Sequence, residues 1–235
     1  MRFDIITIFP EIFDSYFNAS IIKRAQIKKI IEINIHNLRN WATDRHQSVD
    51  DSPYGGGKGM IFMVEPIFKA IKALKKNNKN NKKCRVILFS AKGKRLTQSR
   101  VKNLSRYEQL ILICPRYEGV DERVAKYIAD EEVSIGEYVL TGGELPAMVL
   151  VDAISRLIPG VIKKESLLEE SFSFVSKSSI SGRESLGEYP QYTRPEIFYP
   201  EKDKKVSWRV PKVLVSGNHK KIQDWKLKHF KKIKK

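Results

Sequence analysis

The sequence predicts an α/β fold built on a largely parallel sheet. Strand-like apolar runs alternate along the chain with segments of helical periodicity. Two of these runs, residues 85–89 and 109–114, are apolar almost throughout, which is typical of strands buried on both faces. Residues 144–158 form the most apolar of the helical segments, and Pro159-Gly160 ends it.

Each expected element has a local reason in the sequence. Residues 3–9 and 30–38 alternate Ile with other side chains, as strands do. Pro10 is tolerated in the first turn of a helix, and apolar residues recur every fourth position after it. These residues are Phe13, Phe17 and Ile21. The remaining expected helices are 66–76, 97–105, 121–129 and 218–234, and the remaining expected strands are 133–140 and 213–215.

The composition narrows the class of protein. The chain has 44 Lys and Arg against 27 Asp and Glu, a net charge of +17, and its 41% hydrophobic content excludes a disordered polyelectrolyte. No apolar run reaches the roughly 18 residues of a membrane span. Two cysteines are too few for a disulfide framework or a cysteine-rich zinc site. We therefore expect a cytoplasmic protein with no membrane partner that binds a polyanion such as nucleic acid.

The positive charge is concentrated in two segments. Residues 66–107 carry fourteen bases and no acid, and residues 202–235 carry thirteen bases and two acids. Residues 108–170, in contrast, carry thirteen acids and six bases. Clustered charge favours a phosphate-binding surface built from both basic segments. Compositional drift toward Lys is the alternative, and the stretch 75–83 alone is typical of a solvated loop.

Several common catalytic signatures are absent from the sequence. It has no Walker A phosphate loop, no Gly-x-Gly-x-x-Gly after the first strand and no Gly-x-Ser-x-Gly elbow. The four histidines lack the spacing of a metal site, so no metal ligands are predicted. These absences disfavour a P-loop nucleotidase and an ordinary Rossmann dinucleotide site.

Three segments remain as candidate sites. Residues 50–60 contain four glycines in five positions, which either admit a ligand close to the backbone or simply form a flexible loop. Residues 115–123 follow a buried strand, at the sheet edge where α/β folds bind ligands, although an Arg–Glu pair there could equally cap a helix. Residues 134–146 place a Gly pair between a strand and an apolar helix, which permits a ligand to approach the backbone.

Three strings carry a family resemblance: D-R-H-Q-S-V-D-D-S-P-Y-G-G-G-K-G-M, R-Y-E-G-V-D-E-R-V and S-I-G-E-Y-V-L-T-G-G-E-L-P-A-M. They are followed by S-R-L-I-P-G-V, E-S-F, Y-P-Q-Y-T-R-P-E and V-L-V-S-G-N-H-x-x-I. In this order the strings resemble the bacterial tRNA (guanine-N1-)-methyltransferase family, the TrmD type of the SPOUT superfamily. The resemblance covers nearly the whole chain.

The resemblance implies an α/β SPOUT fold with a deep trefoil knot over about residues 84–158. It implies a methyltransferase domain at 1–162, a flexible linker at 163–187 and a small, mainly helical tRNA-binding domain at 188–235. It also implies a homodimer with each active site at the subunit interface. The implied reaction moves the methyl group of S-adenosylmethionine to ring nitrogen 1 of the guanosine at position 37 of tRNA, next to the anticodon. Magnesium is linked to catalysis in the family, without a protein-bound metal site.

The resemblance also implies two sets of binding residues. Backbone groups of Ile135, Gly136, Tyr138 and Leu140 would hold the adenine and ribose of the cofactor. The full cofactor-binding set is Phe89, Ser90, Pro115, Glu118, Gly119, Ser134, Ile135, Gly136, Glu137, Tyr138, Val139, Leu140, Gly142, Gly143 and Pro146. The set that would receive the guanine is His46, Asp50, Tyr54, Gly55, Gly56, Gly57 and Gly59.

Two catalytic residues follow from the same resemblance. Arg156 would stabilise negative charge on the guanine carbonyl oxygen. The family places a carboxylate base, usually Asp, before Ser-Phe; Glu170 stands there, and we predict it to be the base, with Glu169 as fallback. The chain also departs from the family at Pro115, where glycine is usual, and at Lys58, where proline is usual.

Two alternatives stay open from the sequence. A SPOUT methyltransferase that acts on another RNA position would share the cofactor strings, and a catalytically silent RNA-binding protein would share the fold. The intact string at 134–146 favours activity. The Gly-rich loop and the Y-T-R-P-E string favour tRNA as the substrate.

Overall fold

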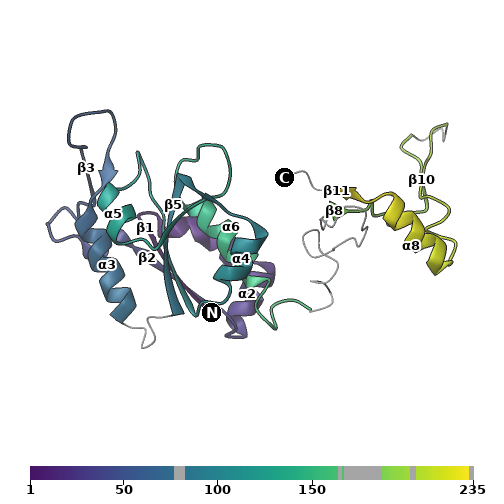
Figure 1. Cartoon of the computed structure of the whole chain (residues 1–235), viewed down its shortest axis with the longest axis horizontal. Coiled ribbons are helices and arrows are strands. Elements are labelled where there is room, and N and C mark those ends of the chain that lie inside the picture. The colour runs from purple at the N-terminus through teal and green to yellow at the C-terminus, as the bar shows by residue number, and fades with distance from the viewer. Residues whose placement is uncertain (77–82, 164–165, 167–186, 202–204, 233–235) are drawn as a thin grey trace, which may run out of the picture. The chain divides into compact units, whose positions relative to one another are not determined.

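A computed structural model describes residues 1–76, 83–163, 166, 187–201 and 205–232 of the chain (Figure 1). The chain divides into two compact units, Met1–Lys163 and Lys164–Lys235. The predicted linker at 163–187 lies almost wholly outside the described residues. Within the described residues, no helix combines the length and apolar character that crossing a membrane requires.

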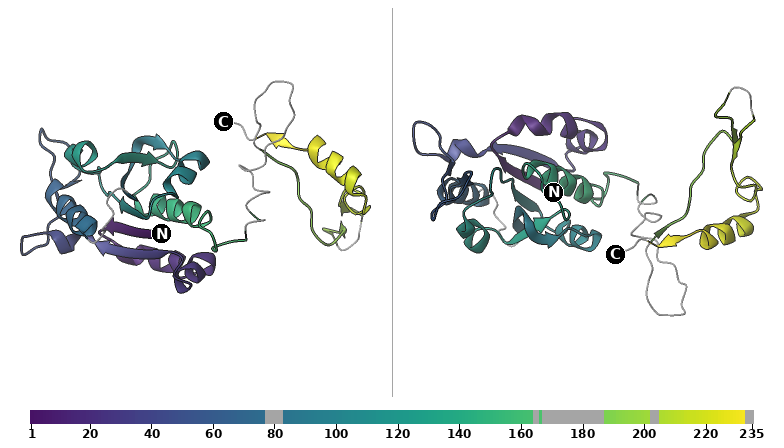
Figure 2. Two further views of the ribbon diagram at one scale, coloured as in Figure 1. Left: turned by 60° about the horizontal axis from the view of Figure 1, so that its bottom comes forward. Right: turned by 90° about the horizontal axis from the view of Figure 1, so that it is seen from above.

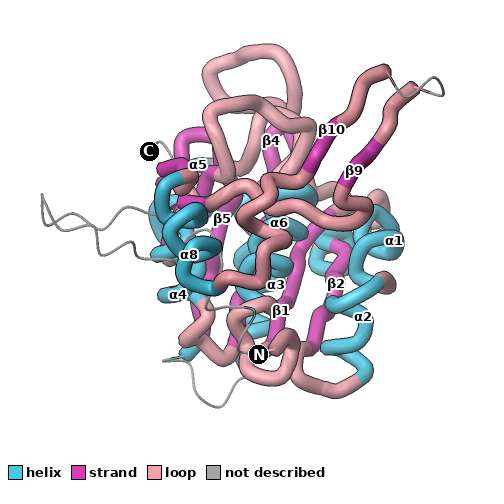
Figure 3. Tube along the Cα trace, turned by 90° about the vertical axis from the view of Figure 1, so that its right-hand side faces the viewer, coloured by secondary structure: helices cyan, strands magenta, loops and turns pink. Residues whose placement is uncertain are grey.

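The sheet of the first unit is parallel throughout. Its strand order is β2-β1-β6-β5-β7, and each neighbouring pair of strands runs in the same direction. The strands are β1 (Arg2–Thr7), β2 (Glu32–Asn37), β5 (Cys84–Arg95), β6 (Gln109–Ile113) and β7 (Glu131–Ser134). Figure 3 shows β1 and β2 lying alongside each other. The predicted α/β class with a largely parallel sheet is confirmed.

Helices cover both faces of this sheet (Figure 1). One face carries α3 (Val64–Lys76) and α5 (Glu122–Tyr127), and the other carries α2 (Ser20–Ile27), α4 (Gln98–Leu104) and α6 (Glu144–Ser155). Successive side chains of a strand point to opposite faces, so Ile5 packs with the α6 side and Ile6 with the α3 side. The central strands are therefore buried on both faces, which explains their continuous apolar sequence.

The predicted strand at 133–140 is wrong beyond Ser134. At that point β7 ends, and the hydroxyl of Ser134 donates a hydrogen bond to the carbonyl of Gly136 at 2.9 Å, which turns the chain away from the ladder. The following residues form an exposed loop in which Tyr138 is 55% and Val139 89% exposed. The sequence of this loop contains apolar residues, as a buried strand does, and this led to the wrong prediction.

Two further elements differ from the prediction. The helix expected after Pro10 is broken, because Ser20 adopts a left-handed φ of 48°, and Ile22 rather than Ile21 is buried. The connections contain η1 (Pro10–Phe13), α1 (Asp14–Phe17), η2 (Leu38–Trp41), β3 (Asp50–Asp51) and β4 (Ile61–Phe62). The strand expected at 213–215 is a turn instead, in which the amide of Ser216 donates to the carbonyl of Val213.

The second unit contains short strands and one described helix, α8 (His219–Lys228) (Figure 2). Its antiparallel pairs are β8 (Gly187–Glu188) with β11 (Lys231–Lys232) and β9 (Ile197–Phe198) with β10 (Trp208–Arg209). The side chain of Asn218 caps α8 by accepting a hydrogen bond from the amide of Lys221 at 3.0 Å. The helix predicted to reach residue 234 ends at Lys228, because residues 231–232 pair with β8 instead.

A buried carboxylate joins three strands of the sheet. Asp4 on β1 is 0% exposed, and Arg2, His36 on β2 and Gln109 on β6 contact its oxygens at 2.8, 2.8 and 2.6 Å. Burial by itself would raise the pKa of Asp4, but the hydrogen bonds from His36, Arg2 and Gln109 outweigh it, so the pKa lies below the usual 3.8. The ionised form therefore stabilises the folded sheet.

We expect Asp4→Asn to lower the free energy of unfolding at neutral pH by about 1–3 kcal/mol, because the substitution removes charged hydrogen bonds in a buried site. Because the pKa of Asp4 is lowered on folding, its contribution is present above about pH 4 and is lost as the pH falls through the lower folded value. Urea denaturation of both proteins from pH 7 to pH 3 measures this. The difference should shrink with acidity, and parallel pH curves would contradict the assignment.

Candidate functional site

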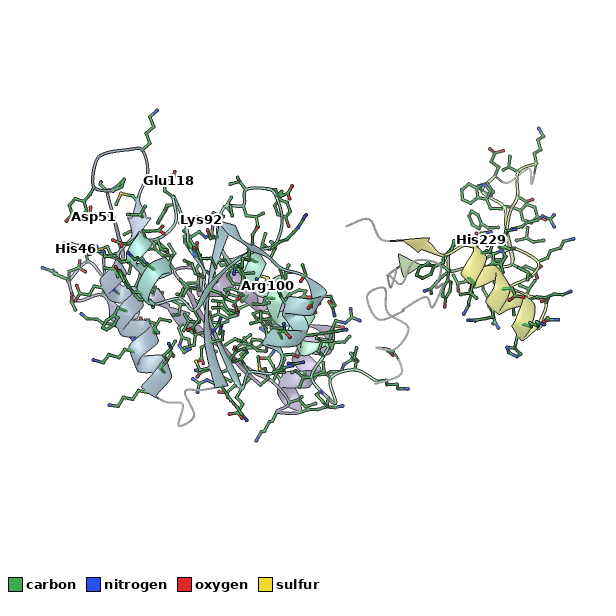
Figure 4. The ribbon with its side chains drawn as sticks, viewed as in Figure 1. His46, Asp51, Lys92, Arg100, Glu118 and His229 are labelled. Carbon is green, nitrogen blue, oxygen red and sulfur yellow. The ribbon has the colours of Figure 1, made fainter. Side chains whose placement is uncertain are left out.

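A cavity of about 520 Å³ lies at the carboxyl end of the sheet in the first unit. Its walls are three segments, residues 88–92 within β5, residues 115–122 after β6 and residues 132–146 at and after β7. Parallel α/β sheets bind ligands at this edge, and the volume suits a small organic molecule. Figure 4 labels Lys92 and Glu118, which both line this cavity.

The second and third segments are locked together by backbone contacts. Arg116 forms an isolated antiparallel bridge with Gly142, and the amide of Gly143 donates to the carbonyl of Pro115 at 2.9 Å. A Cβ atom on Gly143 would lie 2.6 Å from the Cα of Cys114, which no side chain could accommodate. The Gly pair is therefore required by how closely these two segments approach.

An ion pair is buried behind this wall. Glu144, at the start of α6, is 2% exposed, and its Oε2 lies 3.0 Å from Nε of Arg116. The hydroxyl of Thr7, at the end of β1, donates to its Oε1 at 2.7 Å. The guanidinium of Arg116 also lies over the ring of Phe9, 4.8 Å from its centroid. The first turn of a helix favours a negative charge, so α6 adds to the stabilisation of Glu144.

The same pair explains why Gly142 has no side chain. A Cβ atom there would lie 2.5 Å from both Nε of Arg116 and Oε2 of Glu144. Nearby Cys114 is fully buried, and burial together with the charge of Glu144 raises the pKa of its thiol well above 9.0. Cys114 is therefore a neutral core side chain and has no thiolate for nucleophilic chemistry.

The structure separates the two interpretations of residues 115–123. Asp121 caps α5 by accepting a hydrogen bond from the amide of Arg123 at 2.9 Å, and it also pairs with the guanidinium of that residue. The Arg123 side chain lowers the pKa of Asp121. Arg116, in contrast, pairs with Glu144 across the cavity wall. Within residues 115–123, Asp121 therefore caps a helix, whereas Arg116 belongs to the wall of the pocket.

The Gly-rich loop is held against the edge of the pocket. Strand β4 follows the loop, and the amide of Phe62 donates to the carbonyl of Gly119 at 3.0 Å. The amide of Glu118 donates to the carbonyl of Met60 at 3.1 Å. A Cβ atom on Gly59 would lie 2.7 Å from Cγ of Glu118. Two motifs that are more than fifty residues apart in sequence thus meet at one place.

Most of the predicted cofactor-binding residues line the cavity. The exception is Glu137, which is 88% exposed and pairs with Arg95 at 3.4 Å. Those that line it are Phe89, Ser90, Pro115, Glu118, Gly119, Ser134, Ile135, Gly136, Tyr138, Val139, Leu140, Gly142, Gly143 and Pro146. This placement describes the geometry of these residues, while their roles remain a prediction.

The predicted guanine-receiving residues lie outside the cavity. His46, Asp50, Tyr54 and the four loop glycines do not line it, and the side chain of Tyr54 is fully exposed. Gly55, Gly56, Gly57 and Gly59 all have positive φ values, between 81° and 134°. Other residues would be strained there, so the loop requires glycine for its backbone shape.

Of the two predicted catalytic residues the structure describes only Arg156, and this residue does not line the cavity. Arg156 is exposed and caps the C-terminal end of α6, whereas the cavity lies at the N-terminal end. The helix has 12 residues, which corresponds to about 18 Å. Glu170 and Glu169 lie outside the described residues.

Sequence reasoning missed several residues of the cavity. Lys92 lines it and pairs with Glu122 at 2.7 Å, and Glu132 lies 4.0 Å from the same ammonium group. Arg116 lies within the range expected to contact the cofactor, Pro115 to Gly119, but it was not named as a binding residue. The available signal for Lys92 was its position two residues after the predicted Ser90. In the described part of the chain, no cluster of three or more His, Cys, Asp or Glu side chains could hold a metal ion.

Comparison with known proteins gives one consistent result. Residues 1–235 match the family model described as tRNA (Guanine-1)-methyltransferase TrmD. A relative from Ruminiclostridium cellulolyticum is 48% identical over 227 residues, which cover 97% of this chain and 90% of the relative. One from Clostridioides difficile is also 48% identical, over 96% and 90%. One from Syntrophomonas wolfei is 51% identical, over 97% and 84%. All three are named tRNA (guanine-N(1)-)-methyltransferase.

Proposed function

The chain belongs to the tRNA (guanine-1)-methyltransferase family, and on this premise we propose that its acceptor is the guanosine at position 37 of tRNA, next to the anticodon. The family membership establishes an enzyme that methylates nitrogen 1 of guanine in tRNA. The observation that carries the finer proposal is the position of the Gly-rich loop, which the structure holds against the cavity edge at Glu118.

The cavity suits S-adenosylmethionine, the methyl donor that the family implies. Its volume of about 520 Å³ falls in the range of small-molecule pockets. Gly142 and Gly143 let two walls of the cavity approach each other closely, because a Cβ atom on either would collide with Arg116, Glu144 or Cys114. Backbone groups of Ile135, Gly136 and Leu140 would hold the adenine and ribose. When bound, the cofactor supplies a methyl group on a sulfonium, which is already a good leaving group.

We place the trefoil knot of the SPOUT fold at about residues 84–158. Support comes from the cavity walls, because all three wall segments fall in this range. The strand order adds to it, since β5 lies between β6 and β7.

The residues that act on the acceptor have two tasks. One is to remove the proton from ring nitrogen 1, for which a carboxylate within hydrogen-bond reach is sufficient. We assign this task to Glu170. The other is to stabilise the negative charge that grows on the guanine carbonyl oxygen, which we assign to the guanidinium of Arg156. His46, Asp50 and the Gly-rich loop would orient the base, since catalysis of methyl transfer depends on positioning.

The position of Arg156 supports a homodimer. Within one chain Arg156 follows Pro146, the last residue that lines the cavity, by ten residues, which corresponds to about 15 Å along the helix axis. A second chain would bring its own copy of the residue to the site. A surface for that second chain is present on α6, where Leu145 and Val149 are one helical turn apart and are 55% and 45% exposed. Tyr16 is also exposed, and partial burial together with the Asp152 carboxylate on the same helix raises the pKa of its hydroxyl.

We propose that the second unit binds the tRNA. We also propose that the protein acts in the cytoplasm. Residues 202–235 carry thirteen bases and two acids, which suits a phosphate backbone. We assign no protein-bound magnesium; any role of this ion in catalysis would be with the RNA. Methylation at another RNA position is the alternative that the first experiment below separates.

We expect the protein to label a tRNA transcript that carries guanosine at position 37 when it is incubated with methyl-labelled S-adenosylmethionine. A matched transcript with adenosine at that position should receive no label, because its ring nitrogen 1 carries no proton for a base to remove. Mapping of the labelled nucleotide completes the measurement. Equal labelling of both transcripts would contradict the assigned position.

The substitution Glu170→Gln should lower kcat by about a hundredfold or more, because it removes the proton acceptor. The affinity for S-adenosylhomocysteine, measured by calorimetry, should stay unchanged. Glu169→Gln is the matched control and should keep its activity. A fully active Glu170→Gln enzyme would move the base to another residue.

The double substitution Leu145→Asp and Val149→Asp should convert a dimer into a monomer, because it places two charges in the apolar stripe of α6. Sedimentation gives the mass, and circular dichroism shows whether the fold is retained. Methyl transfer should be lost together with the dimer. A wild-type chain that sediments as a monomer and is active would refute the shared site.

A further inference from the structure

We propose that the rings of Phe198 and Trp208 form a platform on which an unpaired base of the tRNA substrate stacks. This inference rests on the proposed function, because it takes tRNA to be the ligand of the second unit. It adds a specific contact surface for the tRNA, which follows neither from the sequence motifs shared with the family nor from the charge of residues 202–235.

The hairpin geometry brings the two rings together. Strands β9 and β10 pair antiparallel, with Trp208 directly opposite Phe198. Residues that are directly opposite in an antiparallel pair lie on the same face. Their ring centroids are 5.5 Å apart, and their planes are inclined by 41°. One face of the strand pair therefore carries two adjacent, tilted aromatic rings.

This surface is open to solvent. The Phe198 side chain is 48% exposed and that of Trp208 is 62% exposed. An isolated two-stranded hairpin has marginal stability in water, so contact between the two rings helps to stabilise this one. About half of the surface area of the rings nevertheless stays exposed. Large aromatic groups in this state are typical of binding surfaces.

Other aromatic rings of the unit are used differently. The ring of Trp225 on α8 stacks on His229, with centroids 4.2 Å apart, and lies 6.2 Å from the ring of Tyr192. The ammonium of Lys226 lies 4.5 Å above the ring of Tyr189. These rings pack along one helix and keep Trp225 half-buried. The hairpin pair belongs to neither cluster, so packing of α8 does not explain it.

The surrounding charge identifies the class of ligand. Trp208 is followed by exposed Arg209, and Lys212, three residues after the end of the strand, is also exposed. They belong to the segment with thirteen bases and two acids. A second copy of this chain would bring the same positive charge to the contact, which opposes self-association here. Aromatic faces beside cations instead suit single-stranded nucleic acid, whose bases stack while its phosphates are neutralised.

The base must be an unpaired one. In a duplex both faces of each base are covered by its neighbours, whereas bases in loops can stack on protein rings. Stacking on the platform would complement the guanine-binding loop of the first unit. It would be tolerant of sequence, because every base has an aromatic face.

The test compares tRNA affinity of full-length variants at several salt concentrations. Trp208→Ala and Phe198→Ala should each weaken binding by about tenfold, the usual size of a lost stacking contact. The slope of affinity against salt should stay unchanged, because no charge is removed. Trp208→Phe keeps a ring and should restore most of the affinity, which separates stacking from loss of the hairpin fold.

Two matched variants complete the design. Tyr127→Ala removes a ring that is 71% exposed in the first unit and should bind tRNA like the wild type. Arg209→Gln should weaken binding and reduce the salt slope by about one. A Trp208→Ala protein that binds tRNA with wild-type affinity would overturn the proposed platform. A Trp208→Ala protein that sediments with a different mass from the wild type would also overturn it, because the ring would then contact another protein chain. Methylation of guanosine 37 by the wild type, measured in parallel, shows separately whether the proposed function holds.

Discussion

The ion pair between Arg116 and Glu144 is the contact on which the pocket depends. It joins the segment after β6 to the start of α6, and Thr7 extends it to the end of β1. The Glu144 carboxylate is buried, and a buried charge is costly unless it is paired; the Arg116 guanidinium lies 3.0 Å from its Oε2, and the Thr7 hydroxyl donates to its Oε1. Gly142 permits this arrangement because the space of its missing Cβ atom is occupied by both charged groups. The string T-G-G-E is therefore required by packing at this contact.

The sequence predicted the sheet well because its strands are buried on both faces. The continuous apolar runs of β5 and β6 could hardly be anything other than central strands. The same reasoning failed at 135–140, where Val139 is apolar but exposed, since a binding loop and a buried strand can share one composition. The break before Ser20 escaped prediction as well, because helical spacing continues across it.

Residue patterns alone placed two of the three cavity walls, at 115–123 and 134–146, but they assigned no roles to individual residues. Periodicity places residues on elements, but it does not pair Arg116 with a residue 28 positions later. All the residues that the resemblance implies for the cofactor line the cavity except Glu137, and their binding role stays a prediction; the resemblance gave no indication of Lys92. It also names Arg156, which lies at the far end of α6 from the cavity. That separation is the observation behind our proposal that a second chain contributes Arg156 to the site.

The most direct measurement of the central claim is the affinity for S-adenosylhomocysteine of Gly142→Ala, determined by calorimetry in the wild-type and Arg116→Ala backgrounds. In the wild-type background the new methyl group should displace the ion pair and weaken binding by about tenfold or more. In the Arg116→Ala background the cost of the same substitution should be clearly smaller, because one of the two obstructing groups is gone. Equal costs in both backgrounds, or no loss in either, would contradict a pocket built on this ion pair.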